Sequence, residues 1–211
     1  MKNAVLVTAI PDMDWVKTHG AMCLEVIRKY FERHNHELIV ITERPKVDAK
    51  HNSWLWLLGH KLYPGYNYLL CWNLDILPQL FDVDIFDYLD MNRIAACVEF
   101  NGLSTFPYYR YNCGLVGMPQ KYQAFFEGCF NKWGNNPKNW PSWEQYYVNM
   151  ELGEQAIDVQ EIPRKFNTFY ESNEKDTVCV HYSFSVYKDR APLATDAMEK
   201  HYKRLKKVGT I

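Results

Sequence analysis

The sequence predicts an α/β fold, a single domain whose first half is a Rossmann-like nucleotide-binding unit. Residues 4–10 are an unbroken apolar run of strand length, residues 37–42 indicate a second buried strand, and apolar residues recur at helical spacing in residues 18–34 between them. Two strands joined through a helix by short connections form a βαβ unit, and fully apolar strands are typical of a parallel sheet covered on both faces. The 211 residues suffice for one such domain with a substantial core.

The alternation of strands and helices continues to the end of the chain. We expect further strands at 66–72, 94–99, 111–118, 156–162 and 177–182, and further helices at 53–62, 120–133, 143–152 and from Asp196 onward. A loop and a short helix should follow Asp75, and the proline-containing segment 135–143 is typical of a loop. No repeat, low-complexity segment or linker divides the sequence, so we expect one domain spanning 1–211.

Composition argues against several classes of function. The formal net charge is −1 and the basic residues form no long stripe, which argues against a nucleic-acid partner. No apolar run reaches the ~18 residues that a membrane helix needs, and the N-terminus resembles a strand rather than a secretion signal. The six cysteines are widely spaced without a CxxC motif, so we expect reduced thiols and a cytoplasmic protein, in the host cytoplasm if the chain is viral.

Asn73 and Asp75 directly follow the apolar strand 66–72. Open α/β sheets bind ligands at the carboxyl ends of their strands, and two residues at this spacing would point the same way if the strand continued. Their oxygens would then suit a hard cation such as Mg²⁺ or Mn²⁺, which typically also binds substrate phosphates. A strand-ending Asn-x-Asp turn without a ligand explains the motif equally well.

His181 lies at the end of the predicted strand 177–182, and Lys188 follows it closely. A histidine at a strand end is, by itself, more often a hydrogen-bonded core residue. Together with Lys188 it could close a metal–diphosphate site, with the imidazole on the metal and the ammonium on the leaving group's phosphates.

Four segments, in order, resemble the GT-A glycosyltransferases, particularly the glycogenin and lipooligosaccharide galactosyltransferase type and the plant xyloglucan xylosyltransferases. AVLVTAIPDMDWVKTHGAM resembles the first strand and uridine-binding loop, and YNYLLCWNLDILP resembles the strand that carries the Asp-x-Asp metal motif. YNCGLVGMP resembles the Asn-Ser-Gly sugar-binding strand. The fourth segment runs from WEQYYVN through IPRKFN to VHYSF and resembles the Asp-Gln helix, the Asn beyond it and the closing His. The resemblance spans most of the chain and implies a central, mostly parallel mixed sheet flanked by helices.

The resemblance also implies a role for each matching residue. A UDP-sugar would be the donor, with UDP-glucose preferred, and Mn²⁺ or Mg²⁺ the cofactor. Residues from about 1 to 95 would form the nucleotide-sugar and metal half, and those from about 96 to 211 the half that binds a glycan or glycoprotein acceptor and closes the site. The implied donor-binding residues are Thr8, Ala9, Asp12 (or the nearby Asp14), Trp15, Lys61, Asn73, Asn112, Gly114 and Lys188; the implied metal ligands are Asp75, His181 and Asn73; and Glu144 and Gln145 would be catalytic.

The metal motif departs from the family pattern. Asn73 stands where the family has its first metal-binding aspartate, so one negative charge is lost and metal binding should be weaker or indirect. Asp82 and Asp84 form a literal Asp-x-Asp, but they follow a proline beyond the strand end. We therefore prefer Asn73 and Asp75.

The catalytic pair departs from it as well. Glu144 replaces an aspartate, and a longer carboxylate could act as a general base on an acceptor hydroxyl, which is inverting chemistry. Gln145 beside the anomeric carbon fits the retaining pattern instead. Both stereochemical outcomes stay open.

The sequence thus predicts a metal-dependent hexosyltransferase, which can belong to a longer polypeptide. The alternative is a catalytically weak or silent relative that binds a sugar nucleotide or a glycan. A nucleotidyltransferase or a dehydrogenase fits poorly, because TAIPDMDW contains no glycine and no GxGxxG follows the first strand. Aromatic residues that could stack on acceptor sugars, or equally be core residues, are Tyr108, Tyr109, Trp140 and Trp143.

Overall fold

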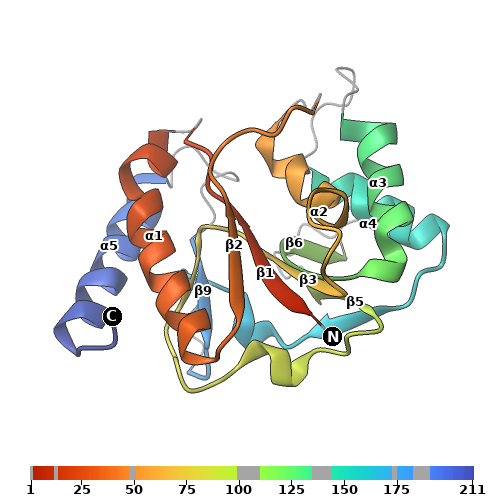
Figure 1. The fold of residues 1–211 in the computed structure, drawn as a ribbon. Helices are drawn as coiled ribbons and strands as arrows, with labels where there is room; N and C mark the ends of the chain where they lie inside the picture. Colours follow the sequence, from red (N-terminus) through yellow and green to blue (C-terminus); the bar gives the residue numbers. More distant parts are fainter. Residues whose placement is uncertain are drawn as a thin grey trace.

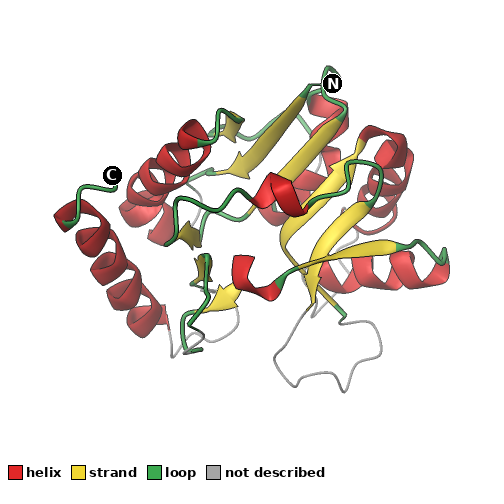
Figure 2. Cartoon of the chain, turned by 90° about the horizontal axis from the view of Figure 1, so that it is seen from below, coloured by secondary structure: helices red, strands yellow, loops and turns green. Residues whose placement is uncertain are grey.

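The computed structural model describes residues 2–11, 14–47, 51–98, 110–134, 144–172, 175–182 and 191–211. A six-stranded sheet of order β2-β1-β3-β6-β5-β7 forms its centre. Helices α1 and α5 lie on one side of this sheet, and α2, α3 and α4 lie on the other (Figure 1). A view from below shows the sheet between the two helical layers (Figure 2).

The element bounds follow the predicted alternation closely. The strands are β1 (Asn3–Thr8), β2 (Glu37–Ile41), β3 (Tyr68–Trp72), β4 (Ile76–Pro78), β5 (Ile94–Val98), β6 (Tyr111–Pro119), β7 (Val159–Ile162), β8 (Thr168–Phe169) and β9 (Cys179–His181). The α-helices are α1 (Asp14–Arg33), α2 (Gly59–Leu62), α3 (Gln123–Cys129), α4 (Glu144–Glu154) and α5 (Ala191–Lys207). Shorter 3₁₀ turns include η1 (Asn52–Leu58), η2 (Ile85–Tyr88) and η5 (Arg164–Phe166).

One strand of the central sheet runs against the others. β1 pairs in parallel with β2 and β3, and β5 pairs in parallel with β7, whereas β6 is antiparallel to both β3 and β5. The first residues of β6 therefore lie at the same edge as the carboxyl ends of the parallel strands. This mixed, mostly parallel sheet between helices confirms the predicted fold class.

A second, three-stranded sheet of order β4-β9-β8 lies beyond this edge. β4 is antiparallel to β9, with Ile76 opposite His181, and β8 is parallel to β9, with Phe169 opposite His181. Neither β4 nor β8 was expected, because each has at most three residues and gains its hydrogen bonds from a distant segment. The loop predicted after Asp75 is thus partly a strand.

Side chains alternate between the two helical layers along β1, as the strand period of two requires. Val5 and Val7 belong to the core under α1 and α5, and Ala4 and Leu6 belong to the core under η1, α2, α3 and α4. Burial on both faces holds β1 in place. The strand leads directly into the loop before α1.

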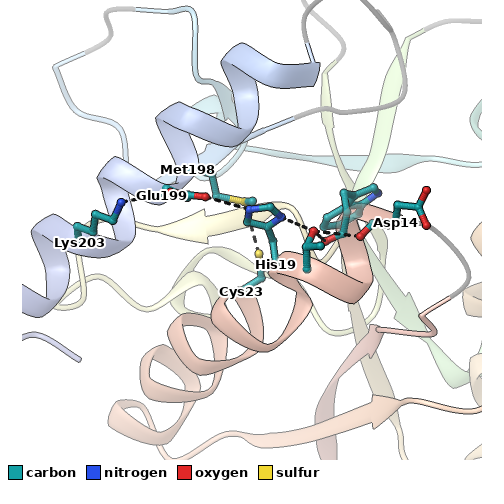
Figure 3. A network of polar contacts seen from close by, with 8 residues as sticks. Asp14, His19, Cys23, Met198, Glu199 and Lys203 are labelled. Atoms are coloured by element: carbon teal, nitrogen blue, oxygen red, sulfur yellow. Dashed lines mark hydrogen bonds and ion pairs between the residues drawn. The ribbon is translucent and has the colours of Figure 1, made fainter.

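Helix α5 is held against α1 by hydrogen bonds between side chains and by a contact between two sulfur atoms (Figure 3). Nε2 of His19 lies 3.1 Å from Oε1 of Glu199, whose other oxygen accepts from Lys203 at 3.2 Å. Between the helices, Sγ of Cys23 lies 3.4 Å from Sδ of Met198. These contacts hold the C-terminal helix against the helix that begins after β1.

Several elements differ in their bounds or type from the sequence prediction, and three helical segments are the clearest cases. α1 begins before residue 18, at Asp14; α5 begins before Asp196, at Ala191; and the segment 53–62 is a 3₁₀ turn followed by a single turn of α-helix. None of the described helices has both the length and the hydropathy to cross a membrane.

Candidate active site

Asp75 and His181 meet where β3 leads into the small sheet. Oδ1 of Asp75 lies 3.5 Å from Nε2 of His181, and their side chains are only 13% and 5% exposed. Two features bring them together: Ile76 pairs with His181, and the amide of Tyr182 donates to the carbonyl of Asp75 at 2.8 Å. The predicted metal residues at 75 and 181 are therefore neighbours, held by backbone pairing.

Asn73 is placed differently from Asp75. β3 ends at Trp72, and the amide of Ile76 donates to the carbonyl of Asn73 at 3.1 Å, which closes a turn. The strand does not continue through this pair, so the condition under which both side chains would point the same way is not met. The Asn73 side chain is exposed, and the backbone N–H of this residue donates to the carbonyl of Gly114 at 2.8 Å.

Gly114 and two asparagines lie next to His181. A Cβ on Gly114 would come within 2.8 Å of Oδ1 of Asn112, 2.9 Å of Ile76 and 3.2 Å of the His181 ring, so only glycine fits here without rearrangement. Oδ1 of Asn112 accepts from the Gly114 amide at 2.8 Å and from Nδ2 of Asn167 at 2.9 Å. Within the described ranges, Oδ1 of Asn167 is buried without a hydrogen-bond donor, so it can accept from a ligand.

Helix α4 supports the start of β6. β3 pairs only with residues 115–119 of β6, which leaves the preceding backbone groups without a strand on that side. Oε1 of Gln145 accepts from the Cys113 amide at 3.0 Å, while Asn149 accepts from the Tyr111 amide at 2.7 Å and donates to its carbonyl at 2.8 Å. Gln145 thus fixes the backbone between Asn112 and Gly114, a role that the sequence did not predict.

Glu144 begins α4 and is buried. Burial raises the pKa of its carboxyl to about 7, and the Ser53 hydroxyl in η1 opposes part of this rise. One carboxyl oxygen, Oε2, has no hydrogen-bond partner within the described part of the chain. The group therefore titrates near neutrality, as a general acid or base would, while its known contact is with η1.

The residues predicted to bind the base lie at the end of β1. Thr8 is the last residue of this strand, the Ala9 amide donates to the Ile41 carbonyl at 2.8 Å, and Trp15 lies in the first turn of α1. The parallel pairing of β1 with β3 puts this segment at the same edge of the sheet as Asn73.

Lys61 lies at the other end of β3. Its neighbour His60 contacts the carbonyl of Met118 at 2.8 Å, and Met118 pairs with Leu69 near the start of β3. The Lys61 ammonium lies 3.9 Å from Glu127. The structure does not bring Lys61 together with Asp75, so it does not support contact with a diphosphate there.

Asp82 and Asp84, the literal Asp-x-Asp, are used elsewhere. Oδ1 of Asp84 caps η2 by accepting from the Phe86 amide at 3.0 Å, and Oδ2 lies 2.7 Å from Nε2 of His36. Asp82 pairs with Arg33. These contacts account for both carboxylates and agree with the choice of Asp75 over this pair.

Several predicted residues lie outside the described residues. They are Asp12 and Lys188 of the donor site and the aromatic residues Tyr108, Tyr109, Trp140 and Trp143.

The donor set around Asp75 suits a divalent cation bound with its substrate. No three His, Cys, Asp or Glu side chains of the described ranges converge as a complete metal site. A carboxylate oxygen and an imidazole nitrogen 3.5 Å apart nevertheless fit two ligands of an ion whose remaining ligands are phosphate oxygens and water. The residues present therefore fit Mn²⁺ or Mg²⁺ bound together with a diphosphate.

Sequence reasoning missed Asn149, Phe169 and the unpaired oxygen of Asn167. Asn167 belongs to a segment with a family resemblance, but nothing in the sequence showed that its amide reaches Asn112. Phe169 lies in β8 and packs on the His181 ring. β8 is too short for its pattern to be recognised.

No protein-family model matches the chain, and no curated protein matches its sequence. Solved structures do match. A glycosyltransferase involved in glycosylation of the major capsid of PBCV-1 has a TM-score of 0.68 at 14% identity, over 93% of this chain and 100% of that chain. The galactosyltransferase LgtC, solved with donor and acceptor sugar analogs, has a TM-score of 0.54 at 11% identity, over 94% and 95%.

A Drosophila β1,4-galactosyltransferase 7 mutant, in complex with manganese, UDP-Gal and xylobiose, has a TM-score of 0.53 at 12% identity, over 86% of this chain and 71% of that chain. Identities this low establish the fold alone. The resemblance drawn from four sequence segments is confirmed at that level. The chain has the GT-A glycosyltransferase fold.

Proposed function

We propose that this protein is a divalent-metal-assisted glycosyltransferase that moves a hexose from a UDP-sugar to a glycan or glycoprotein acceptor. The observation that carries the proposal is the 3.5 Å approach of Asp75 and His181 at the ligand-binding edge of a glycosyltransferase fold. Structural neighbours solved with a UDP-sugar, manganese and sugar acceptors support the same class of ligands.

Asp75 and His181 are the proposed protein ligands of Mn²⁺ or Mg²⁺, with the amide oxygen of Asn73 beside them. When bound, the ion neutralises the diphosphate and stabilises UDP as the leaving group. Because Asn73 is neutral, the protein supplies one carboxylate, so the metal should bind mainly together with the nucleotide. The donor's base and ribose would contact Thr8, Ala9 and Trp15.

Gly114, Asn112 and Asn167 are the proposed contacts of the donor sugar. A side chain at residue 114 would collide with Asn112, Ile76 and His181 and would displace the groups that line this site. The unpaired Oδ1 of Asn167 can accept a hydrogen bond from a sugar hydroxyl. Gln145 holds this backbone through Cys113, so its loss should displace the sugar site even if its amide makes no direct contact.

Glu144 and Gln145 remain the proposed catalytic residues. With a pKa of about 7, Glu144 can remove a proton from an acceptor hydroxyl near neutral pH, which gives inversion. If Gln145 lies beside the anomeric carbon, retention is expected instead. NMR of the anomeric proton of the first product formed distinguishes the two outcomes.

A second candidate is a weak or silent sugar-nucleotide-binding protein. The observation that favours it is the incomplete metal site, in which a neutral, exposed Asn73 accompanies only two convergent ionisable ligands among the described residues. This candidate binds a UDP-sugar but does not break its glycosidic bond.

Release of UDP from UDP-glucose, with Mn²⁺ and either water or a panel of glycans as acceptor, tests the proposal. Wild-type protein should release UDP, and Asp75→Asn should not. Binding of UDP-glucose without any release across the acceptor panel would favour the silent candidate.

We also propose that the protein works in a reducing, cytoplasmic compartment, in agreement with its six buried, free cysteines.

A further inference from the structure

Among the described residues, none makes the hydrogen bond that usually orients a metal-binding imidazole to the ring of His181. Such a histidine normally donates its second ring N–H to a carboxylate, carbonyl or water, which fixes the ring. His181 is 95% buried at its side chain, and within the described part of the chain its Nδ1 has no hydrogen-bond partner. Some other contact must hold the ring toward Asp75.

Phe169 makes that contact. The rings of Phe169 and His181 stack with centroids 5.0 Å apart and planes 19° from parallel. The pairing of β8 with β9 sets Phe169 opposite His181, and the Tyr170 amide donates to the His181 carbonyl at 3.2 Å. The stack is therefore built on paired backbone.

We propose that Phe169 is a positioning residue, whose ring face holds the His181 imidazole in the orientation that binds the metal. This inference rests on the proposed function, because it assumes a cation at Asp75 and His181. A flat face restricts rotation of the imidazole about its last side-chain bond. The ring is then oriented before the ligand binds, so less entropy is lost on binding.

The structure provides a matched control one residue further along both strands. Tyr170 stacks on Tyr182 with centroids 5.8 Å apart and planes 16° from parallel. Tyr170→Leu therefore removes a comparable stack from the same pair of segments without touching His181. Phe169→Leu removes the flat face at the site while keeping an apolar side chain, and Phe169→Tyr restores the face.

The test measures UDP affinity by calorimetry with Mn²⁺ and with EDTA, together with the NMR shifts of the His181 ring protons. Phe169→Leu should reduce the Mn²⁺-dependent gain in affinity about tenfold, leave affinity in EDTA unchanged, and remove the upfield ring-current shift of the His181 protons. Phe169→Tyr should retain both properties, and Tyr170→Leu should retain the Mn²⁺-dependent gain.

Equal Mn²⁺-dependent gains in wild type and Phe169→Leu would overturn the inference and leave the proposed function standing. Equal losses in Phe169→Leu and Tyr170→Leu would also overturn it, because they would show general loosening of the small sheet. If wild-type protein itself shows no Mn²⁺-dependent gain in UDP affinity, that result contradicts the proposed metal-assisted function, and with it the inference that rests on it.

Discussion

The carboxylate of Asp75 lies 3.5 Å from Nε2 of His181, although the two residues are far apart in the chain. A tight turn after β3 and the pairing of β4 with β9 hold them there. Because the backbone positions both groups, the side chains can be changed without dismantling the local fold. Substitutions of these two side chains therefore test their chemical role separately from the stability of the fold.

Asp75→Asn should lower the Mn²⁺-dependent affinity for UDP-glucose by more than about tenfold and abolish transfer. The substitution keeps the shape but removes the only charged oxygen ligand that we propose. Because backbone pairing holds this segment, the melting temperature should change little. Calorimetry and thermal melts on the same preparation give both quantities.

The Asp82→Ala/Asp84→Ala double variant is the control for that change. Loss of the Asp84 cap should cost roughly 1 kcal/mol of stability, without loss of the Mn²⁺-dependent affinity. An inactive double variant beside an active Asp75→Asn would show that the metal motif has been assigned to the wrong residues.

Asn73→Asp should tighten the binding of Mn²⁺ with UDP several-fold. The side chain is exposed in a turn, so a carboxylate is tolerated, and it restores the second negative charge beside Asp75. Titration of Mn²⁺ at fixed UDP measures the effect. Unchanged or weaker binding would indicate that residue 73 does not face the ion.

Gly114→Ala should cost about 1–3 kcal/mol of stability, because its Cβ would overlap Asn112 and Ile76. It should also weaken sugar-nucleotide binding relative to UDP alone. Gly128→Ala in α3 is the matched control: nothing lies within 4 Å of its Cβ, so it should be neutral or stabilising. Urea melts separate the two variants, and similar stabilities would contradict the packing at residue 114.

Glu144→Gln should change how stability depends on pH. In the wild type the folded carboxyl keeps its proton up to a pKa of about 7, whereas the unfolded one loses it near 4.5. Glu144 therefore costs nothing below pH 4.5, destabilises the fold increasingly between pH 4.5 and 7, and costs about 3 kcal/mol above pH 7. The glutamine variant should match the wild type at pH 4.5 and be more stable at pH 8.

Denaturant unfolding at several pH values measures this difference. A constant gap between wild type and Glu144→Gln across that range would show that the carboxyl is not held protonated by burial. Loss of transfer in the same variant, with donor affinity retained, would support its role as the general base.

The fold could be predicted because its main signals are local. The strands β1 and β3 carry continuous apolar runs, and the buried residues of α1 recur at helical spacing. Asp75 and His181 could be placed at strand ends from the sequence pattern, whereas Asn112 and Gly114 were assigned to the site from the family resemblance alone. The resemblance also added the pairing of Asp75 with His181.

The rest depends on contacts that no local pattern records. β4 and β8 exist only because β9 pairs with them, and the Phe169 stack depends on that pairing. Lys61 precedes the metal strand in sequence, but its helix turn packs against the start of that strand and not its end. Gln145 was expected at the anomeric carbon, whereas its oxygen is bonded to the backbone of β6.

The most direct test of the central claim is calorimetry of wild-type protein with UDP-glucose, in the presence of Mn²⁺ and again in EDTA. A metal-bridged donor held by Asp75 and His181 predicts tighter binding with Mn²⁺ by more than about tenfold, and the loss of that gain in Asp75→Asn. Equal affinity for UDP-glucose with Mn²⁺ and with EDTA would contradict the account.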